Sequence, residues 1–227
     1  MLRSAKGLMG FTIGASDGEI GEVEALIFDD QQWTVRYFVV DTSGWLTGPR
    51  VLISPISVRR PEWPARRLPV ALTKPQVQAS PGVGEHRAIS RQFEIAFAQY
   101  YGIPYYWPSG VEDQRLRNTH DVLGYALHAT DGALGHVEDF LVEDLTWRIR
   151  YMEVDTRNWW PGKCVLVAPE WIERVSWEDS AVMVALPRDV IKNAPEYDAS
   201  HPLDRAYEHR LYDFYGRSGY WEERAAA

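Results

Sequence analysis

The chain has 227 residues, of which 45% are apolar and 25% are charged, as in an ordinary folded protein, so wholesale disorder is excluded. The formal charge of −8 disfavours a phosphate backbone as partner, so we expect no binding to nucleic acid. The single cysteine excludes an internal disulfide, and no run of about 18 apolar residues predicts a membrane-spanning helix. These features favour a cytoplasmic protein.

The elements predicted in chain order begin with a turn at Asp17-Gly18. Alternating β-branched and aromatic residues then predict strands over residues 20–28 and 33–41. After a loop at 42–48, Pro55 separates two short strands, and one more strand precedes a short helix that ends before Pro81. The ranges of these later strands are 50–54, 56–60 and 68–72.

A second helix is predicted over residues 90–101. Phe93, Phe97 and Tyr101 recur at helical spacing, Ser90 is placed to cap the first turn, and Gly102 is placed to end the helix. The aromatic segment that follows is too apolar for a flexible linker, so we expect it to pack on a barrel, either that of its own half or the other one.

The whole pattern recurs at an offset of 114 residues without a gap. Asp17–Glu24 falls on Asp131–Glu138, and Trp33, Arg36 and Tyr37 fall on Trp147, Arg150 and Tyr151. The identities continue through Asp41, Thr42, Trp45, Arg91, Glu94, Tyr101, Gly102, Tyr106 and Trp107, which fall on Asp155, Thr156, Trp159, Arg205, Glu208, Tyr215, Gly216, Tyr220 and Trp221. The chain is therefore two copies of one unit, residues 1–113 and 114–227.

The residues of each copy resemble the PRC-barrel, the family of the cytoplasmic domain of the photosynthetic reaction-centre H subunit. The resemblance lies in Asp17–Gly21, Trp33–Thr42 and Val51–Pro55, and it covers about residues 5–81 and 119–195. It implies a mainly β fold with two tandem small β-barrels, each followed by short peripheral helices in 82–113 and 196–227. It also implies docking onto other proteins and, in the H subunit, an influence on electron and proton transfer.

Catalytic and metal sites are weakly indicated. Two carboxylates recur in both copies, as Asp41 and Asp155 and as Glu24 and Glu138, but no nucleophile or histidine recurs with them. The side chain of Asp41 is placed to accept hydrogen bonds in the turn that follows it. The histidines at 120, 128 and 136 recur every eight residues, a spacing that need not converge on a metal. Cys164 has an arginine as its counterpart, so a redox role is disfavoured. We therefore expect no catalytic residue, no metal and no cofactor.

Surface tryptophans and arginines are the candidate binding residues. Trp45 lies in the loop after the predicted strand 33–41, and Trp159 and Trp160 lie in the equivalent loop of the second copy. Exposed aromatic residues often anchor interfaces. The arginines at 59, 60, 66 and 67 flank Trp63 and form a local basic patch on an acidic chain. These features favour a non-enzymatic scaffold or adaptor that binds another protein, either in the cytoplasm or in a complex at the membrane surface, with a homodimer as a further option. The alternatives are an accessory factor of photosynthetic or respiratory electron transfer, and a small-ligand protein or hydrolytic enzyme.

Overall fold

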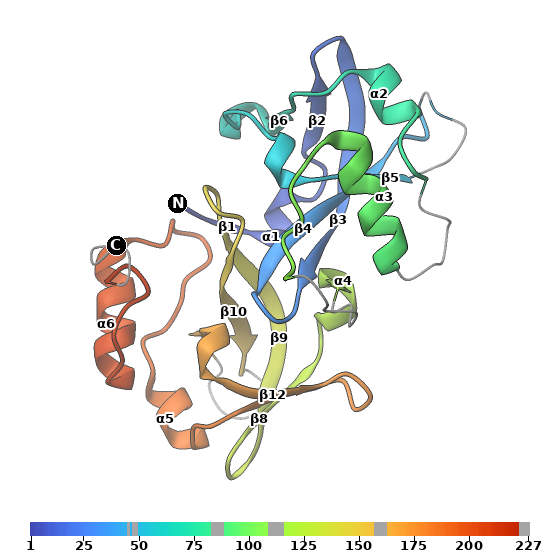
Figure 1. Ribbon diagram of the computed structural model, residues 1–227. Helices are drawn as coiled ribbons and strands as arrows, with labels where there is room; N and C mark the ends of the chain where they lie inside the picture. The colour runs from blue at the N-terminus through green and yellow to red at the C-terminus, as the bar shows by residue number, and fades with distance from the viewer. Residues whose placement is uncertain (45, 47–49, 83–88, 109–115, 157–162, 223–227) are drawn as a thin grey trace. The chain divides into compact units, whose positions relative to one another are not determined.

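The computed structural model describes the chain except for residues 45, 47–49, 83–88, 109–115, 157–162 and 223–227 (Figure 1). The described residues form two compact units. The first unit is Ala5–Asp121, and the second unit joins Met1–Ser4 to Val122–Ala227. The two copies in the sequence meet between residues 113 and 114, whereas the boundaries of the compact units lie after residue 4 and after residue 121. The boundaries differ because the first strand of each copy pairs with a strand of the other copy.

The first unit is built on a sheet with the order β5-β4-β3-β2-β6. Its long central strands are β3 (Gly18–Asp29) and β4 (Thr34–Asp41). The shorter strands are β2 (Thr12–Ala15), β5 (Arg50–Ile53) and β6 (Arg67–Pro69). A sixth strand, β7 (Leu116–Asn118), comes from the start of the second copy and pairs antiparallel with β3. The β2–β6 pair is parallel, and the other pairs of this sheet are antiparallel.

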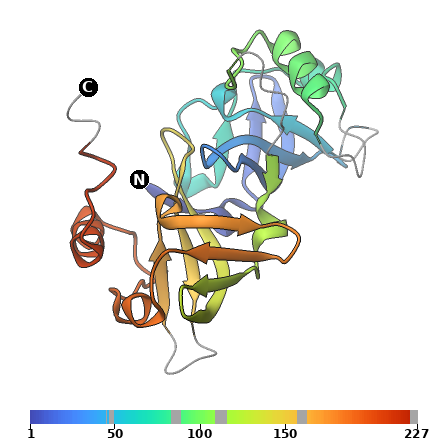
Figure 2. The same ribbon diagram turned by 60° about the horizontal axis from the view of Figure 1, so that its bottom comes forward.

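The second unit repeats this sheet as β11-β10-β9-β8-β13-β12. The strands are β8 (Ala126–Ala129), β9 (Gly132–Glu143), β10 (Ile149–Asp155), β11 (Cys164–Val167), β12 (Ile172–Ser176) and β13 (Ala181–Val184), the last two forming a hairpin drawn in orange in Figure 2. Strand β1 (Leu2–Ser4), from the start of the first copy, pairs antiparallel with β9. The two copies have thus exchanged their first strands.

Each unit also contains short helices. The first unit has α1 (Ala5–Leu8), α2 (Lys74–Gln78) and α3 (Arg91–Tyr101), with 3-10 turns at Pro55–Ser57 and Trp63–Ala65. Helix α4 (Thr119–Val122) follows β7, and the second unit has α5 (Arg188–Asn193), α6 (Arg205–Tyr215) and a 3-10 turn at Pro169–Trp171. The predicted caps of the second helix are confirmed, because Ser90 accepts from the Phe93 amide and Gly102 has a left-handed φ of 65°.

The core of the first unit includes a cluster between its sheet and α3. Ile27, Tyr37 and Leu52 from three strands are buried against Phe97 of α3. Val39 and Phe93 pack around this cluster. The aromatic helix therefore packs on the sheet of its own unit.

One predicted strand is wrong. Residues 56–60 form no strand: their first residues lie in the 3-10 turn Pro55–Ser57, and Val58 makes an isolated bridge to Val70. The second copy does form a ladder there, between β12 and β13. Proline occupies positions 61 and 69, where the second copy has Val175 and Met183, and proline cannot donate to a ladder.

The mainly β class is confirmed, with two sheets, but barrel closure is not shown. Within the described residues, no strand pairing joins the two ends of either sheet. None of the helices in the described part of the chain has the length and hydropathy of a membrane-spanning segment.

Candidate functional site

A buried glutamate ties α3 to the sheet of the first unit. Glu94 is completely buried, and its Oε1 accepts hydrogen bonds from the Tyr37 hydroxyl at 3.2 Å and the Tyr106 hydroxyl at 2.5 Å. Arg91 forms an ion pair with its other oxygen at 2.7 Å. Because Tyr37 lies on β4 and Tyr106 lies beyond the end of α3, one carboxylate joins the strand, the helix and the aromatic segment.

The second unit contains the same network. Glu208 on α6 accepts from the Tyr151 hydroxyl and the Tyr220 hydroxyl, each at 2.8 Å. Arg205 pairs with Glu208 at 3.0 Å. The residues that recur at the offset of 114 therefore include a complete buried hydrogen-bond network.

An arginine from the sheet covers each network. The guanidinium of Arg36 lies 3.8 Å from the ring centroid of Tyr106, and it pairs with Asp29 at 3.2 Å. In the second unit, Arg150 lies 4.0 Å from the ring centroid of Tyr220. Such stacking adds attraction beyond the buried area, so the aromatic segments are held at both the hydroxyl and the ring face.

Burial raises the pKa of Glu94, although the hydrogen bond from Tyr106 and the charge of Arg91 oppose the change. Burial also raises the pKa of Tyr37 and of Tyr106, and the neighbouring Glu94 carboxylate adds to both. A tyrosine with a raised pKa keeps its proton and stays a hydrogen-bond donor. The network is therefore suited to holding the helix on the sheet.

The four arginines of the predicted basic patch differ in their contacts. Arg66 is exposed and donates to a backbone carbonyl at 2.7 Å, whereas Arg67 forms an ion pair within its hairpin, at 3.5 Å. Arg59 and Arg60 are exposed, and their side chains make no ion pair with the described residues. Ile56, beside them in sequence, leaves 59% of its surface exposed.

The loop tryptophans predicted to bind a partner, Trp45, Trp159 and Trp160, lie outside the described residues. Trp33 and Trp147, which occupy equivalent positions in the two copies, are described. Trp147 is buried, and Trp33 is half-buried and stacks on Phe28 with ring centroids 5.3 Å apart.

The repeated aspartates occupy different environments. Asp41 is exposed, and it accepts from the Ser43 amide at 2.8 Å, which supports the predicted turn role. That hydrogen bond lowers the pKa of Asp41. Asp155, at the same position of the second unit, is buried.

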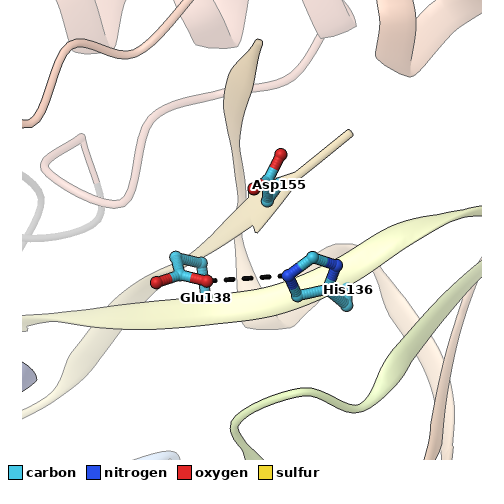
Figure 3. Close-up of side chains that lie close together, drawn as sticks. All are labelled: His136, Glu138 and Asp155. Carbon is cyan, nitrogen blue, oxygen red and sulfur yellow. Dashed lines mark ion pairs between the residues drawn. The ribbon is translucent and has the colours of Figure 1, made fainter. Parts of the chain in front are cut away.

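Asp155 belongs to a cluster of three potential metal ligands. One ligand atom each of His136, Glu138 and Asp155 lie within 4.8 Å of one another. Figure 3 shows His136 and Glu138 side by side on β9 and Asp155 on the neighbouring β10. The His136 Nε2 lies 3.6 Å from the Glu138 Oε2. Of the three histidines spaced by eight residues, His136 alone is in this cluster, so the eight-residue spacing does not build it.

An open groove in the second unit includes Cys164, the register partner of Asp155. It is lined by Glu153, Lys163, Cys164, Glu196, Tyr197, Asp198 and Ala199. Burial raises the pKa of Tyr197 to about 12, helped by the negative charges of Glu153 and Asp139. Three carboxylates and the amino group of Lys163 therefore line this groove.

The sequence prediction missed both the Glu94 network and the His136 cluster. The repetition of Arg91, Glu94 and Tyr106 was a usable signal, because a glutamate kept inside an apolar helical stripe needs partners. The cluster depends on a β-bulge at Glu138, between the register pairs Val137↔Val154 and Asp139↔Glu153. A bulge of this kind does not follow from the alternation of residues along one strand.

No family model matches the chain. A segment of 93 residues, 40% of the chain, is 40% identical to a protein of Deinococcus radiodurans that carries the description "uncharacterized". The match covers 31% of that protein, so the aligned part is under a third of its length.

Proposed function

We propose that this protein is a non-enzymatic adaptor with two units of the PRC-barrel type, and that it binds an acidic surface of another protein. The observation that carries the proposal is the exposed patch of Ile56, Arg59 and Arg60 on the first unit. Two exposed arginines without ion pairs among the described residues follow a large exposed apolar residue within four positions of the sequence. Apolar contact flanked by arginine is a common composition of protein interfaces.

The difference between the two copies supports the same proposal. The residues that hold the helices recur, whereas two of the three patch residues do not: Glu170 and Glu173 stand where the first unit has Ile56 and Arg59, and only Arg60 recurs, as Arg174. A position that changes between copies is free of the demands of the shared fold. The basic patch is therefore a property of one unit, as expected for a surface with its own partner.

The test is quantitative capture from native lysate with the full chain and two variants. Arg59→Glu/Arg60→Glu reverses the patch, and Arg174→Glu makes the same change at the position equivalent to Arg60 in the second unit. We expect at least one protein to bind the wild type and Arg174→Glu, to be lost with the double variant, and to bind directly when purified. Because charges steer such contacts, its binding should weaken with added salt. If every captured protein binds the double variant as well as the wild type, the proposal is wrong.

A further inference from the structure

Of four equivalent positions at the edge of each sheet, two hold the same carboxylate in both units and two differ. In the first unit they hold Glu22, Glu24, Asp41 and Arg50. Arg50 donates to both carboxylate oxygens of Glu24, through Nε at 2.6 Å and through a shorter bond from Nη2. A guanidinium thus pairs with one of the carboxylates and offsets part of their charge.

The second unit has a different set of side chains at these positions: His136, Glu138, Asp155 and Cys164. A histidine has replaced one carboxylate, and a cysteine has replaced the arginine. Asp155 pairs in register with His136 on one side and with Cys164 on the other, so the three residues form one row across β9, β10 and β11. Directly paired residues of an antiparallel sheet point to the same face. The position of the cation in the first unit therefore holds a potential ligand in the second.

We propose that His136, Glu138 and Asp155 bind a divalent transition-metal ion such as Zn²⁺. Two ligand atoms on one zinc ion lie about 3.4 Å apart, because metal–ligand bonds are about 2.1 Å long. The present separations, all within 4.8 Å, close with shifts of about 1.4 Å or less. The side chains of His136 and Glu138 are one-third exposed, so rotation about their side-chain bonds can supply such shifts, whereas Asp155 is buried.

The donor set selects the class of metal. An imidazole with two carboxylates suits zinc, manganese, iron or nickel, whereas calcium and magnesium prefer oxygen donors alone. The surroundings favour a cation of either class, because Asp139 and Glu153 are buried on the same pair of strands. Their counterparts in the first unit are Ala25 and Val39, so this negative charge is also specific to the second unit.

The test is calorimetric titration of the untagged full chain with ZnCl₂ in the presence of excess Mg²⁺. We expect one Zn²⁺ to bind per chain. His136→Ala and Glu138→Gln change partly exposed side chains, and each should weaken binding at least about tenfold. The controls His128→Ala and Glu24→Gln remove a histidine outside the cluster and the equivalent glutamate of the first unit, and both should bind as the wild type does.

A fifth variant tests whether an arginine at the position of Cys164 displaces the metal ion. Cys164→Arg restores the residue of the first unit, and its guanidinium should pair with Glu138 as Arg50 pairs with Glu24, which abolishes Zn²⁺ binding. Circular dichroism confirms that each variant is folded before titration. The proposal is overturned if the wild type binds no Zn²⁺, or if His136→Ala and Glu138→Gln bind it as tightly as the two controls.

Discussion

Glu94 shows how one residue carries the attachment of a helix. Its carboxylate is completely buried and has partners on both oxygens, Tyr37 and Tyr106 on one and Arg91 on the other. Removing one partner of a buried polar group costs more than the bond itself, because the other partners lose their match. The two tyrosines and the arginine explain why the glutamate recurs in both copies.

The raised pKa of Glu94 predicts a pH dependence of stability. Since the folded pKa lies above the ordinary value of 4.5, the folded state holds the proton more tightly than the unfolded state. Its contribution to stability is complete below pH 4.5 and is lost as the pH rises through the folded pKa. Glu94→Gln removes this titration, so the thermal midpoint of the variant should fall less than that of the wild type between pH 4.5 and neutrality.

The matched control for this experiment is Glu173→Gln, which removes an exposed carboxylate. Its midpoint should follow that of the wild type at each pH. Equal pH profiles for the wild type and Glu94→Gln would contradict the role given to burial.

Gly21 on β3 gives a second prediction for a single residue. A Cβ added at Gly21 would lie 1.8 Å from the carbonyl oxygen of Asp41, a distance that the backbone must open to relieve. We expect Gly21→Ala to destabilise the first unit by more than about 2 kcal/mol. Gly44→Ala, where nothing lies within 4 Å of the new Cβ, should change the stability by less than about 0.5 kcal/mol. Urea unfolding measures both, and a similar loss in the two variants would refute the steric explanation.

Among the strand pairs, those of the exchanged strands β1 and β7 join the residues that are furthest apart in the sequence. β7 pairs with β3 through Asn118, Arg117 and Leu116, and Arg117 adds an ion pair to Asp30 at 3.0 Å. Thr119, just after β7, accepts from the Leu26 amide at 3.4 Å. The first unit therefore uses residues from the beginning of the second copy.

Two fragments test the contribution of β7. The fragment 5–121 contains β7, and the fragment 5–113 ends before it. Since the shorter fragment leaves the edge of β3 unpaired, we expect its thermal midpoint to be lower by at least about 5 °C. Equal midpoints, measured by circular dichroism at one protein concentration, would show that β7 adds nothing to the first unit.

Prolines explain where the two sheets differ. The first unit has Pro61 and Pro69 where the second has Val175 and Met183, and only the isolated bridges Val58↔Val70 and Glu62↔Arg67 remain of its ladder. The second unit forms the full β12–β13 ladder at the same place. The prolines that distinguish the first copy from the second therefore explain why residues 56–60 form no strand.

At the scale of the whole molecule, duplication has left two units with one fold and two surfaces. The first unit keeps apolar residues at Ala25 and Val39 and an arginine at Arg50, whereas the second has two buried carboxylates and a cysteine at these positions. Buried carboxylates need partners, and Asp139 accepts hydrogen bonds from the Ser4 hydroxyl and the Phe140 amide. The two units thus share a fold, whereas the surroundings of these positions differ.

The sequence by itself determined the duplication, the mainly β class, the long strands around Trp33 and Trp147, and the caps of α3. These features follow from residue type and spacing along the chain, where φ preferences, side-chain alternation and capping hydrogen bonds act locally. The exchange of β1 and β7, the bulge at Glu138 and the burial of Glu94 were decided by the tertiary structure. Each of them depends on which distant segments pair and in which register, and that choice is made by packing between parts of the chain that no local preference connects.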